Sequence, residues 1–199
     1  LSHCQPPTTS DLIHHYNRMP LPVALFVPNL LGYARILLSF LALHYCRTNP
    51  VLVVSIWICS ALLDLIDGIL ARALNQCSSL GVLLDIAADN ILRTTTWIAA
   101  ASQDDSYVLI ASLIISLEWT TMVCTQLHAT QSGKHWKTTR EHDPWWIKKI
   151  FANNFKTPLG TLCLCGLFGS GACVYMSNSQ NHEVFSNLLP YFYYWKYAV

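Results

Sequence analysis

Long apolar runs separated by short polar connections constrain the fold of this chain more than any other feature. A helix that crosses a bilayer needs about 20 largely apolar residues. Five runs reach that length, and a sixth, aromatic-rich run is shorter: 28–46, 51–74, 81–101, 107–127, 157–177 and 183–199. Only 12% of the 199 residues are charged, against about 25% in soluble domains. We therefore predict an all-α integral membrane protein, a bundle of about six transmembrane helices.

Two regions follow from this pattern. The polar residues 1–20 are expected to form a cytosolic or interfacial segment with a short helix over 11–19, and residues 21–199 one membrane domain. The eight cysteines include no CxxC pair. Because most of them lie in apolar runs, we expect small apolar filler rather than disulfides or zinc ligands.

The distribution of lysine and arginine predicts an orientation. The segment 1–20 holds Arg18, the second-to-third connection is edged by Arg72, and the opposite side offers only Arg47. The long connection 128–156 carries the remaining cluster: Lys134, Lys137, Arg140, Lys148, Lys149 and Lys156. Positive charge stays on the cytosolic side, so we expect both termini and the long loop there. A net charge of +1 gives no reason to expect a nucleic-acid partner.

The loop 128–156 also contains His128, His135 and His142. A zinc site is the less favoured interpretation of these histidines. A basic interfacial segment, with Trp145 and Trp146 dipping into the membrane, fits the composition better.

Four carboxylates interrupt the apolar pattern between residues 64 and 89. Asp64 and Asp67 are three residues apart, and Asp85 and Asp89 are four apart, so each pair shares one helix face. The connection 75–80 is short, which makes the two helices antiparallel neighbours. At about 1.5 Å per residue all four acids lie roughly 12–20 Å from that turn. They can therefore meet between the second and third helices, at the cytosolic side.

Carboxylates that face one another repel unless cations are present. A set of oxygen ligands favours hard divalent ions such as Mg²⁺ or Mn²⁺, and two such ions suit phosphoryl transfer. A proton or ion pathway is the main rival interpretation of acids within a membrane. Arg35 is about seven residues into the first helix, which places it roughly 10 Å from the same cytosolic side. It could contact phosphate, form a salt bridge with an acid, or snorkel.

Small residues accompany the acids. Gly68, Ala71 and Gly81 could leave a groove for a ligand, although glycines of this kind also serve helix packing. Arg72, at the edge of its helix, could hold a phosphate oxygen or act only as an interfacial positive charge.

The fixed spacing Asp64-x2-Asp67-Gly68-x2-Ala71-Arg72-x8-Gly81-x3-Asp85-x3-Asp89 resembles the signature of the CDP-alcohol phosphotransferases at every position. The blocks FVPNLLGYARI (26–36), ARALNQ (71–76) and SLGVLLD (79–85) are similar to the eukaryotic phosphatidylinositol synthase branch of that family.

The resemblance implies a site for CDP-diacylglycerol and two divalent ions. Asp64, Asp67, Asp85 and Asp89 would be the metal ligands, and Asp89 would also be the general base that activates an alcohol, with inositol as the expected acceptor. The residues implied to line the CDP pocket are Gly68, Ala71, Arg72 and Gly81. A homodimer in the endoplasmic reticulum membrane is likewise what the resemblance implies.

The chain departs from the inositol branch on the acceptor side. That branch usually has Arg after the last Asp, where this chain has Asn90, with Arg93 one turn further on. In the fourth helix an acidic residue remains as Glu118, but it is followed by Trp119-Thr120-Thr121 instead of a Ser-His-Trp cluster. The residues expected to contact phosphate or acceptor are Arg35, Arg93, Glu118 and Lys134. Another acceptor (glycerol phosphate or serine), or a catalytically silent lipid-binding or interaction protein, are the alternatives.

Overall fold

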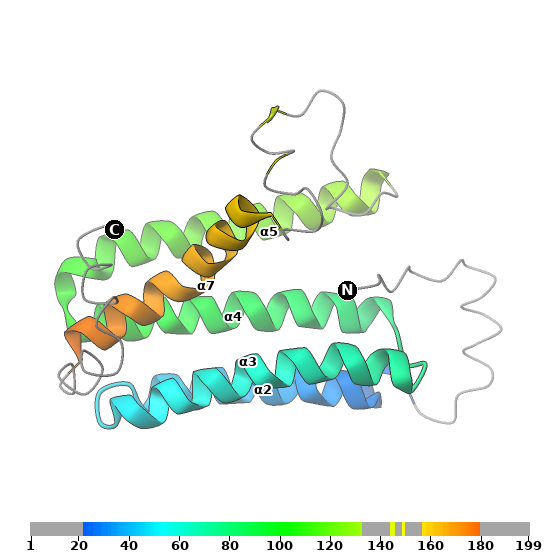
Figure 1. The fold of residues 1–199 in the computed structure, drawn as a ribbon, viewed down its shortest axis with the longest axis horizontal. Coiled ribbons are helices and arrows are strands. Elements are labelled where there is room, and N and C mark those ends of the chain that lie inside the picture. Colours follow the sequence, from blue (N-terminus) through cyan, green and yellow to red (C-terminus); the bar gives the residue numbers. More distant parts are fainter. Residues whose placement is uncertain (1–21, 133–143, 146–148, 150–156, 180–199) are drawn as a thin grey trace. The chain divides into compact units, whose positions relative to one another are not determined.

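The structure is a computed structural model that describes residues 22–132, 144–145, 149 and 157–179. The regular structure of these residues is helical (Figure 1). The long helices are α2 (Val27–Tyr45), α3 (Pro50–Ala73), α4 (Ser79–Gln103), α5 (Val108–Ser132) and α7 (Pro158–Asn178), and two 3₁₀ turns are η1 (Val23–Leu25) and η2 (Asp105–Tyr107). The runs predicted at 28–46, 51–74 and 157–177 each agree with a helix to one residue, whereas α5 continues five residues beyond the predicted 127. The predicted segments 11–19 and 183–199 lie outside the described residues.

The chain divides into two compact units, Leu1–Thr95 and Thr96–Val199, which are described separately. In the first unit, α2 and α3 pack against each other along their length (Figure 1). Each helix has a proline in its first two residues, Pro28 in α2 and Pro50 in α3, and a proline lacks the N–H that a first turn leaves unpaired. Asn49 caps α3, because its side-chain oxygen accepts from the N–H of Leu52 at 3.1 Å.

The connection between α3 and α4 is fixed by its own polar groups. Asn75 adopts φ 54°, a left-handed conformation that ends α3 and that asparagine tolerates better than most residues. The backbone N–H of Gln76 donates to the carbonyl of Ala71 at 2.9 Å. The side-chain oxygen of Gln76 accepts from the N–H of Val27 at 2.9 Å. Ser78 Oγ accepts from the N–H of Gly81 at 3.0 Å and starts α4. This turn therefore joins the start of α2 to both acidic helices.

Helix α4 approaches α2 closely at two glycines. A Cβ on Gly32 would lie 2.7 Å from Cδ2 of Leu84, and one on Gly81 would lie 2.8 Å from Oδ1 of Asn29. Small residues permit such close contact between helices. The contact supports a packing role for Gly81, because a side chain at position 81 would collide with that of Asn29.

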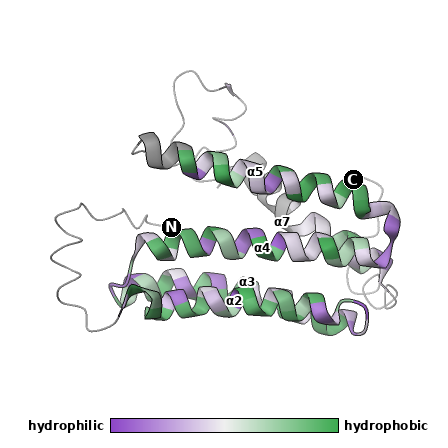
Figure 2. Ribbon diagram, turned by 180° about the vertical axis from the view of Figure 1, so that it is seen from behind, coloured by the Kyte–Doolittle hydropathy of each residue, from purple (hydrophilic) through white to green (hydrophobic). Residues whose placement is uncertain are grey.

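The outer faces of the first unit are apolar, as the green stretches of Figure 2 show. Leu37 is 70% exposed and Leu65 is 65% exposed, whereas Asn29, Ser39 and Ser60 are fully buried. Polar groups inside and large apolar groups outside are the arrangement expected in lipid. Among the residues that the structure describes, three segments are long and apolar enough to cross a membrane by length and composition: Val27–Tyr45, Pro50–Ala73 and Asp105–Leu127.

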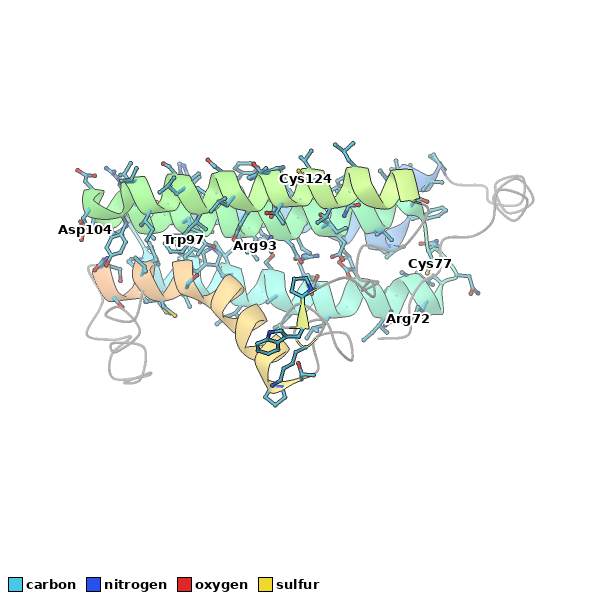
Figure 3. The ribbon with its side chains drawn as sticks, turned by 90° about the horizontal axis from the view of Figure 1, so that it is seen from above. Arg72, Cys77, Arg93, Trp97, Asp104 and Cys124 are labelled. Atoms are coloured by element: carbon cyan, nitrogen blue, oxygen red, sulfur yellow. The ribbon has the colours of Figure 1, made fainter. Side chains whose placement is uncertain are left out.

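In the second unit, α7 packs on the end of α4. A Cβ on Gly171 would lie 3.1 Å from Thr96 and 3.3 Å from the indole ring of Trp97, so the helices meet at a glycine here too. Trp97, which is labelled in Figure 3, is 2% exposed, and Tyr175 is fully buried. The turn into α5 is capped by Asp104, whose carboxylate accepts from the N–H of Ser106 at 3.0 Å.

Candidate metal centre

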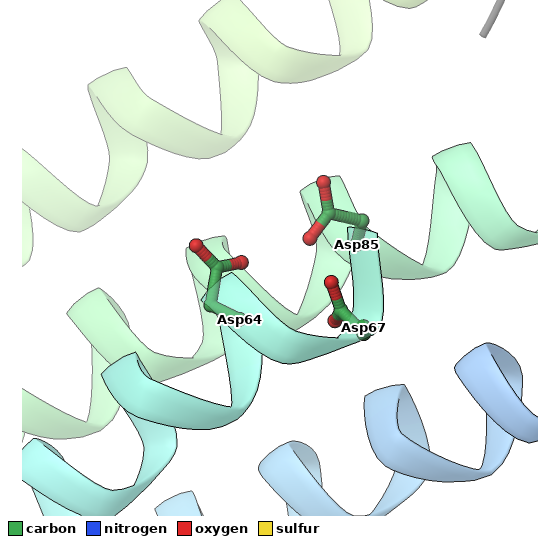
Figure 4. A group of neighbouring side chains, drawn as sticks. All are labelled: Asp64, Asp67 and Asp85. Carbon is green, nitrogen blue, oxygen red and sulfur yellow. The ribbon is translucent and has the colours of Figure 1, made fainter. Parts of the chain in front are cut away.

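Three of the four predicted carboxylates form a cluster. Asp64 and Asp67 come from α3 and Asp85 from α4, and one oxygen of each lies within 4.8 Å of the others (Figure 4). The three-residue spacing on α3 places two carboxylates on one face, and the short turn 74–78 brings α4 alongside. The structure thus brings together acids that the sequence places on facing helix surfaces.

Arg35 of α2 lies in the middle of these acids. Its Nη1 is 2.8 Å from an oxygen of Asp64, 3.3 Å from Asp67 and 2.9 Å from Asp85. Its Nη2 contacts Asp89 at 2.5 Å, so the fourth acid joins the group through the arginine. Of the three roles open to Arg35 from sequence, the structure shows the salt bridge.

The cluster has a buried side and an open side. The Arg35 side chain is 2% exposed and that of Asp67 is 13% exposed, whereas Asp64 and Asp85 are 40% and 51% exposed. One guanidinium faces four carboxylates, so the group has an excess of acceptors when all are ionised. The more exposed carboxylates of Asp64 and Asp85 therefore give the cluster an open side with excess negative charge.

The donor set fits a hard divalent cation. The Asp64–Asp67–Asp85 cluster offers carboxylate oxygens, and ligands of this kind suit Mg²⁺ or Mn²⁺ better than Zn²⁺ or copper. Carboxylates held on two helices leave the remaining coordination positions to water or substrate phosphate.

The glycines around the cluster differ in their surroundings. A Cβ on Gly68 would meet only the guanidinium of Arg72, at 3.6 Å, and is otherwise in open space. Gly81, by contrast, packs on Asn29. A side chain at position 68 would therefore meet only the exposed Arg72. The CDP pocket expected from Gly68, Ala71, Arg72 and Gly81 stays a prediction.

Asn90 and Arg93 form a pair next to Asp89. Asn90 is 1% exposed, and Nη2 of Arg93 donates to its Oδ1 at 2.5 Å. The guanidinium of Arg93 therefore reaches back one turn to position 90. Glu118 belongs to α5 in the second unit, and Lys134 lies outside the described residues; their contacts to phosphate or acceptor stay predictions.

Two features were missed from sequence. Asn29 is fully buried, with Nδ2 donating to the carbonyl of Val23 at 2.6 Å; the signal was a polar residue inside the first turn of an apolar helix. Cys77 is disulfide-bonded in the structure. The expectation of cysteine as apolar filler is therefore wrong for Cys77, whose place in a polar turn distinguished it.

The sequence is similar to known proteins over most of its length. The sequence matches the CDP-alcohol phosphatidyltransferase family over residues 25–179. A relative from Schizosaccharomyces pombe is 28% identical over 66% of this chain and 56% of its own length; one from Drosophila melanogaster is 38% identical over 48% of this chain and 43% of its own. One from Homo sapiens is 43% identical over 34% of this chain and 32% of its own length.

Each of these relatives is named CDP-diacylglycerol–inositol 3-phosphatidyltransferase. The chain spans about half the length of the curated relatives it matches. No solved structure matches. The family match covers more than half of the chain, including all four acids, and the chain therefore belongs to the CDP-alcohol phosphatidyltransferase family.

Proposed function

We propose that this protein is a membrane phosphatidyltransferase that transfers a phosphatidyl group from CDP-diacylglycerol to myo-inositol, giving phosphatidylinositol and CMP. The observation that carries the proposal is the cluster of Asp64, Asp67 and Asp85, held beside Asp89 by Arg35. The family match and the names of the relatives support the same donor and acceptor.

The chain supplies ligands, a base and a pocket. Asp64, Asp67, Asp85 and Asp89 would hold two divalent ions, Mg²⁺ or Mn²⁺, which when bound neutralise the diphosphate and the leaving CMP. Asp89 would accept the proton of the attacking hydroxyl. A new P–O bond forms to the alcohol oxygen while the P–O bond to CMP breaks, so the phosphatidyl group moves and CMP departs as an anion.

The donor would lie along the open side of α3. Gly68 leaves the space, and Arg72 places a guanidinium next to it. A guanidinium suits phosphate oxygens because its donors match their geometry. Ala71 and Gly81 complete the proposed pocket. Gly81 also packs against the side chain of Asn29, which a Cβ at position 81 would contact at 2.8 Å.

The acceptor side supports inositol less directly, because Asn90 replaces an expected arginine. The Arg93 guanidinium, which contacts Asn90, supplies a positive charge close to the missing one. Transfer to glycerol phosphate or serine remains the second candidate function, and Asn90 is the observation that favours it.

The proposed setting is the endoplasmic reticulum membrane. A bundle of six helices, with both termini and the acidic site facing the cytosol, accounts for the positions of the lysines and arginines. A homodimer is part of the proposal on family resemblance. Residues 1–20 would be interfacial and residues 21–199 the membrane domain.

The test is an alcohol screen with the purified full chain in detergent. CMP release is measured with CDP-diacylglycerol, Mg²⁺ or Mn²⁺, and labelled inositol, serine or glycerol phosphate in turn. We expect release with inositol and incorporation of its label into lipid. Release only with another alcohol would replace the acceptor, and no release with any alcohol would favour a silent lipid-binding protein. Asn90→Arg is expected to raise turnover with inositol relative to the other alcohols.

A further inference from the structure

Arg35 occupies the place that a cation would need in the acidic cluster. Its Nη1 lies 2.8, 3.3 and 2.9 Å from single oxygens of Asp64, Asp67 and Asp85. A guanidinium only donates hydrogen bonds and cannot coordinate a metal. Because Mg²⁺ binds carboxylate oxygens at about 2.0–2.1 Å, those three oxygens cannot surround an ion and this nitrogen together.

The guanidinium is held in place mainly by these acids. Arg35 is 2% exposed, and its Nη atoms reach Asp64, Asp67, Asp85 and Asp89. Its buried Nε has no hydrogen-bond partner in the structure. An unsatisfied buried donor is unfavourable. Because Nε contributes no hydrogen bond, the side-chain contacts that hold the guanidinium within the described residues are those of its Nη atoms with the four carboxylates. If the acids take another cation, little else within this site retains the guanidinium where it lies.

We propose that Arg35 is the internal counter-ion of the metal-free site and that divalent ions displace it from the carboxylates. Without metal, the guanidinium draws acids from α3 and α4 together and keeps their repulsion from separating the helices. With metal, the ions take over that task. The inference rests on the proposed function and gives Arg35 a positioning role within it, as a residue that sets how tightly the site binds metal.

The two possible roles of Arg35, supporting the fold or competing with the metal, predict opposite effects of its removal on metal affinity. A residue that only supports the fold should weaken metal binding when it is removed, because the ligands lose their arrangement. A competing cation should strengthen metal binding when it is removed, because the ion no longer has to displace it. The sign of the change in Mn²⁺ affinity therefore separates the two roles.

The experiment compares the full chain with Arg35→Gln in detergent, both purified with Mn²⁺ and then stripped with EDTA. Binding of Mn²⁺ is followed by loss of the free-ion electron paramagnetic resonance signal. We expect Arg35→Gln to bind Mn²⁺ at least about tenfold more tightly than the unmodified protein. Its melting temperature should fall below that of the unmodified protein in EDTA, and Mn²⁺ should largely close the gap.

Arg72→Gln is the matched control for charge. It removes an equal charge on α3, and within the described residues the structure shows no ion pair for Arg72. Its effect on Mn²⁺ affinity should stay below about threefold, because an exposed charge acts weakly. If Arg35→Gln does not survive stripping, Arg35→Lys serves instead: a single ammonium cannot reach both Asp64 and Asp89, so its Mn²⁺ affinity should lie above that of the unmodified protein.

Unchanged or weaker Mn²⁺ binding by the Arg35 variants, in a preparation whose unmodified protein releases CMP, would overturn this inference and leave the proposed function standing. An equal gain in affinity in Arg72→Gln would overturn it too, as a general effect of charge. If no protein in the series binds Mn²⁺ and none releases CMP, both the inference and the proposed function are wrong.

Discussion

At the scale of single residues, Asp67 is the acid of the cluster whose substitution tests the proposed metal site most directly. Asp67 is the least exposed of the four, and its oxygen lies within reach of both Asp64 and Asp85. Asp67→Asn keeps the shape of the side chain but removes its charge. Under the proposed function we expect CMP release to fall about a hundredfold or more, since even residues outside the metal's own ligands commonly cost 10–100-fold.

The control for this change is Asp105→Asn. Asp105 is an exposed acid in η2, outside the cluster. Its substitution should leave the rate of CMP release within about twofold, because exposed charges away from a site have little effect. A normal rate in Asp67→Asn would remove Asp67 from the proposed ligands.

Two glycines of the signature are predicted to respond differently to the same added methyl group. At Gly81 the new Cβ would lie 2.8 Å from Oδ1 of Asn29 and 3.2 Å from Oγ of Ser78, so the fully buried Asn29 side chain must shift or α2 and α4 must move apart. Overpacking of this kind costs about 1–3 kcal/mol. We therefore expect Gly81→Ala to lower the melting temperature clearly.

Gly68→Ala is the counterpart. The new Cβ meets only the flexible end of Arg72, and alanine favours a helix by about 1 kcal/mol over glycine. We expect a melting temperature equal to or above that of the unmodified protein, with a raised KM for CDP-diacylglycerol because the methyl group narrows the groove. Equal destabilisation by both alanines would mean that Gly68 also serves packing.

At the scale of elements, the turn after α3 sets where α4 begins. Asn75 has φ 54°, where β-branched side chains are strained. Asn75→Val should cost about 1–2 kcal/mol and lower the melting temperature, whereas Asn75→Gly should be close to neutral. Comparison of the two variants by thermal unfolding checks this. Equal melting temperatures would show that the turn relaxes without affecting the fold.

The helices themselves were largely predictable from sequence, and the reasons are local. Prolines 28 and 50 mark the starts of α2 and α3, and polar residues between apolar runs mark the ends. The sequence 128–132 is polar, so the extension of α5 to Ser132 could not be read from apolar content. The helix continues beyond the apolar run because backbone hydrogen bonds between successive turns do not require apolar side chains.

The acidic cluster was predictable as a meeting of side chains, but its centre was not. Spacing puts two acids on each helix face, and the short turn pairs the helices. Rise per residue gives only depth, so the sequence placed Arg35 roughly 10 Å from the cytosolic side of the membrane and said nothing of its distance from the acids. Its contacts with all four acids depend on the lateral packing of α2 and on a long side chain's rotamer, which no periodicity encodes.

At the scale of the whole molecule, the proposed topology makes a prediction about sidedness. The connection 46–49 and the turn 104–107 should face the lumen, and the turn 74–78 should face the cytosol. A single reporter cysteine at each position, in a chain with its other cysteines replaced, should react with a membrane-impermeant reagent from opposite sides of sealed microsomes. Labelling of all three from one side would contradict the topology.

The ion pairs of Arg35 also bear on how the chain enters a membrane during synthesis. Helix α2 precedes α3, and either alone would bring charge into hydrocarbon at about 2.5–3.5 kcal/mol for each Arg or Asp near a helix centre. Paired as a helical hairpin, Arg35 and Asp64 meet at 2.8 Å and each supplies the other's counter-charge. The two helices are therefore suited to leave the translocation machinery together, so the same arginine that organises the site would also ease its insertion into lipid.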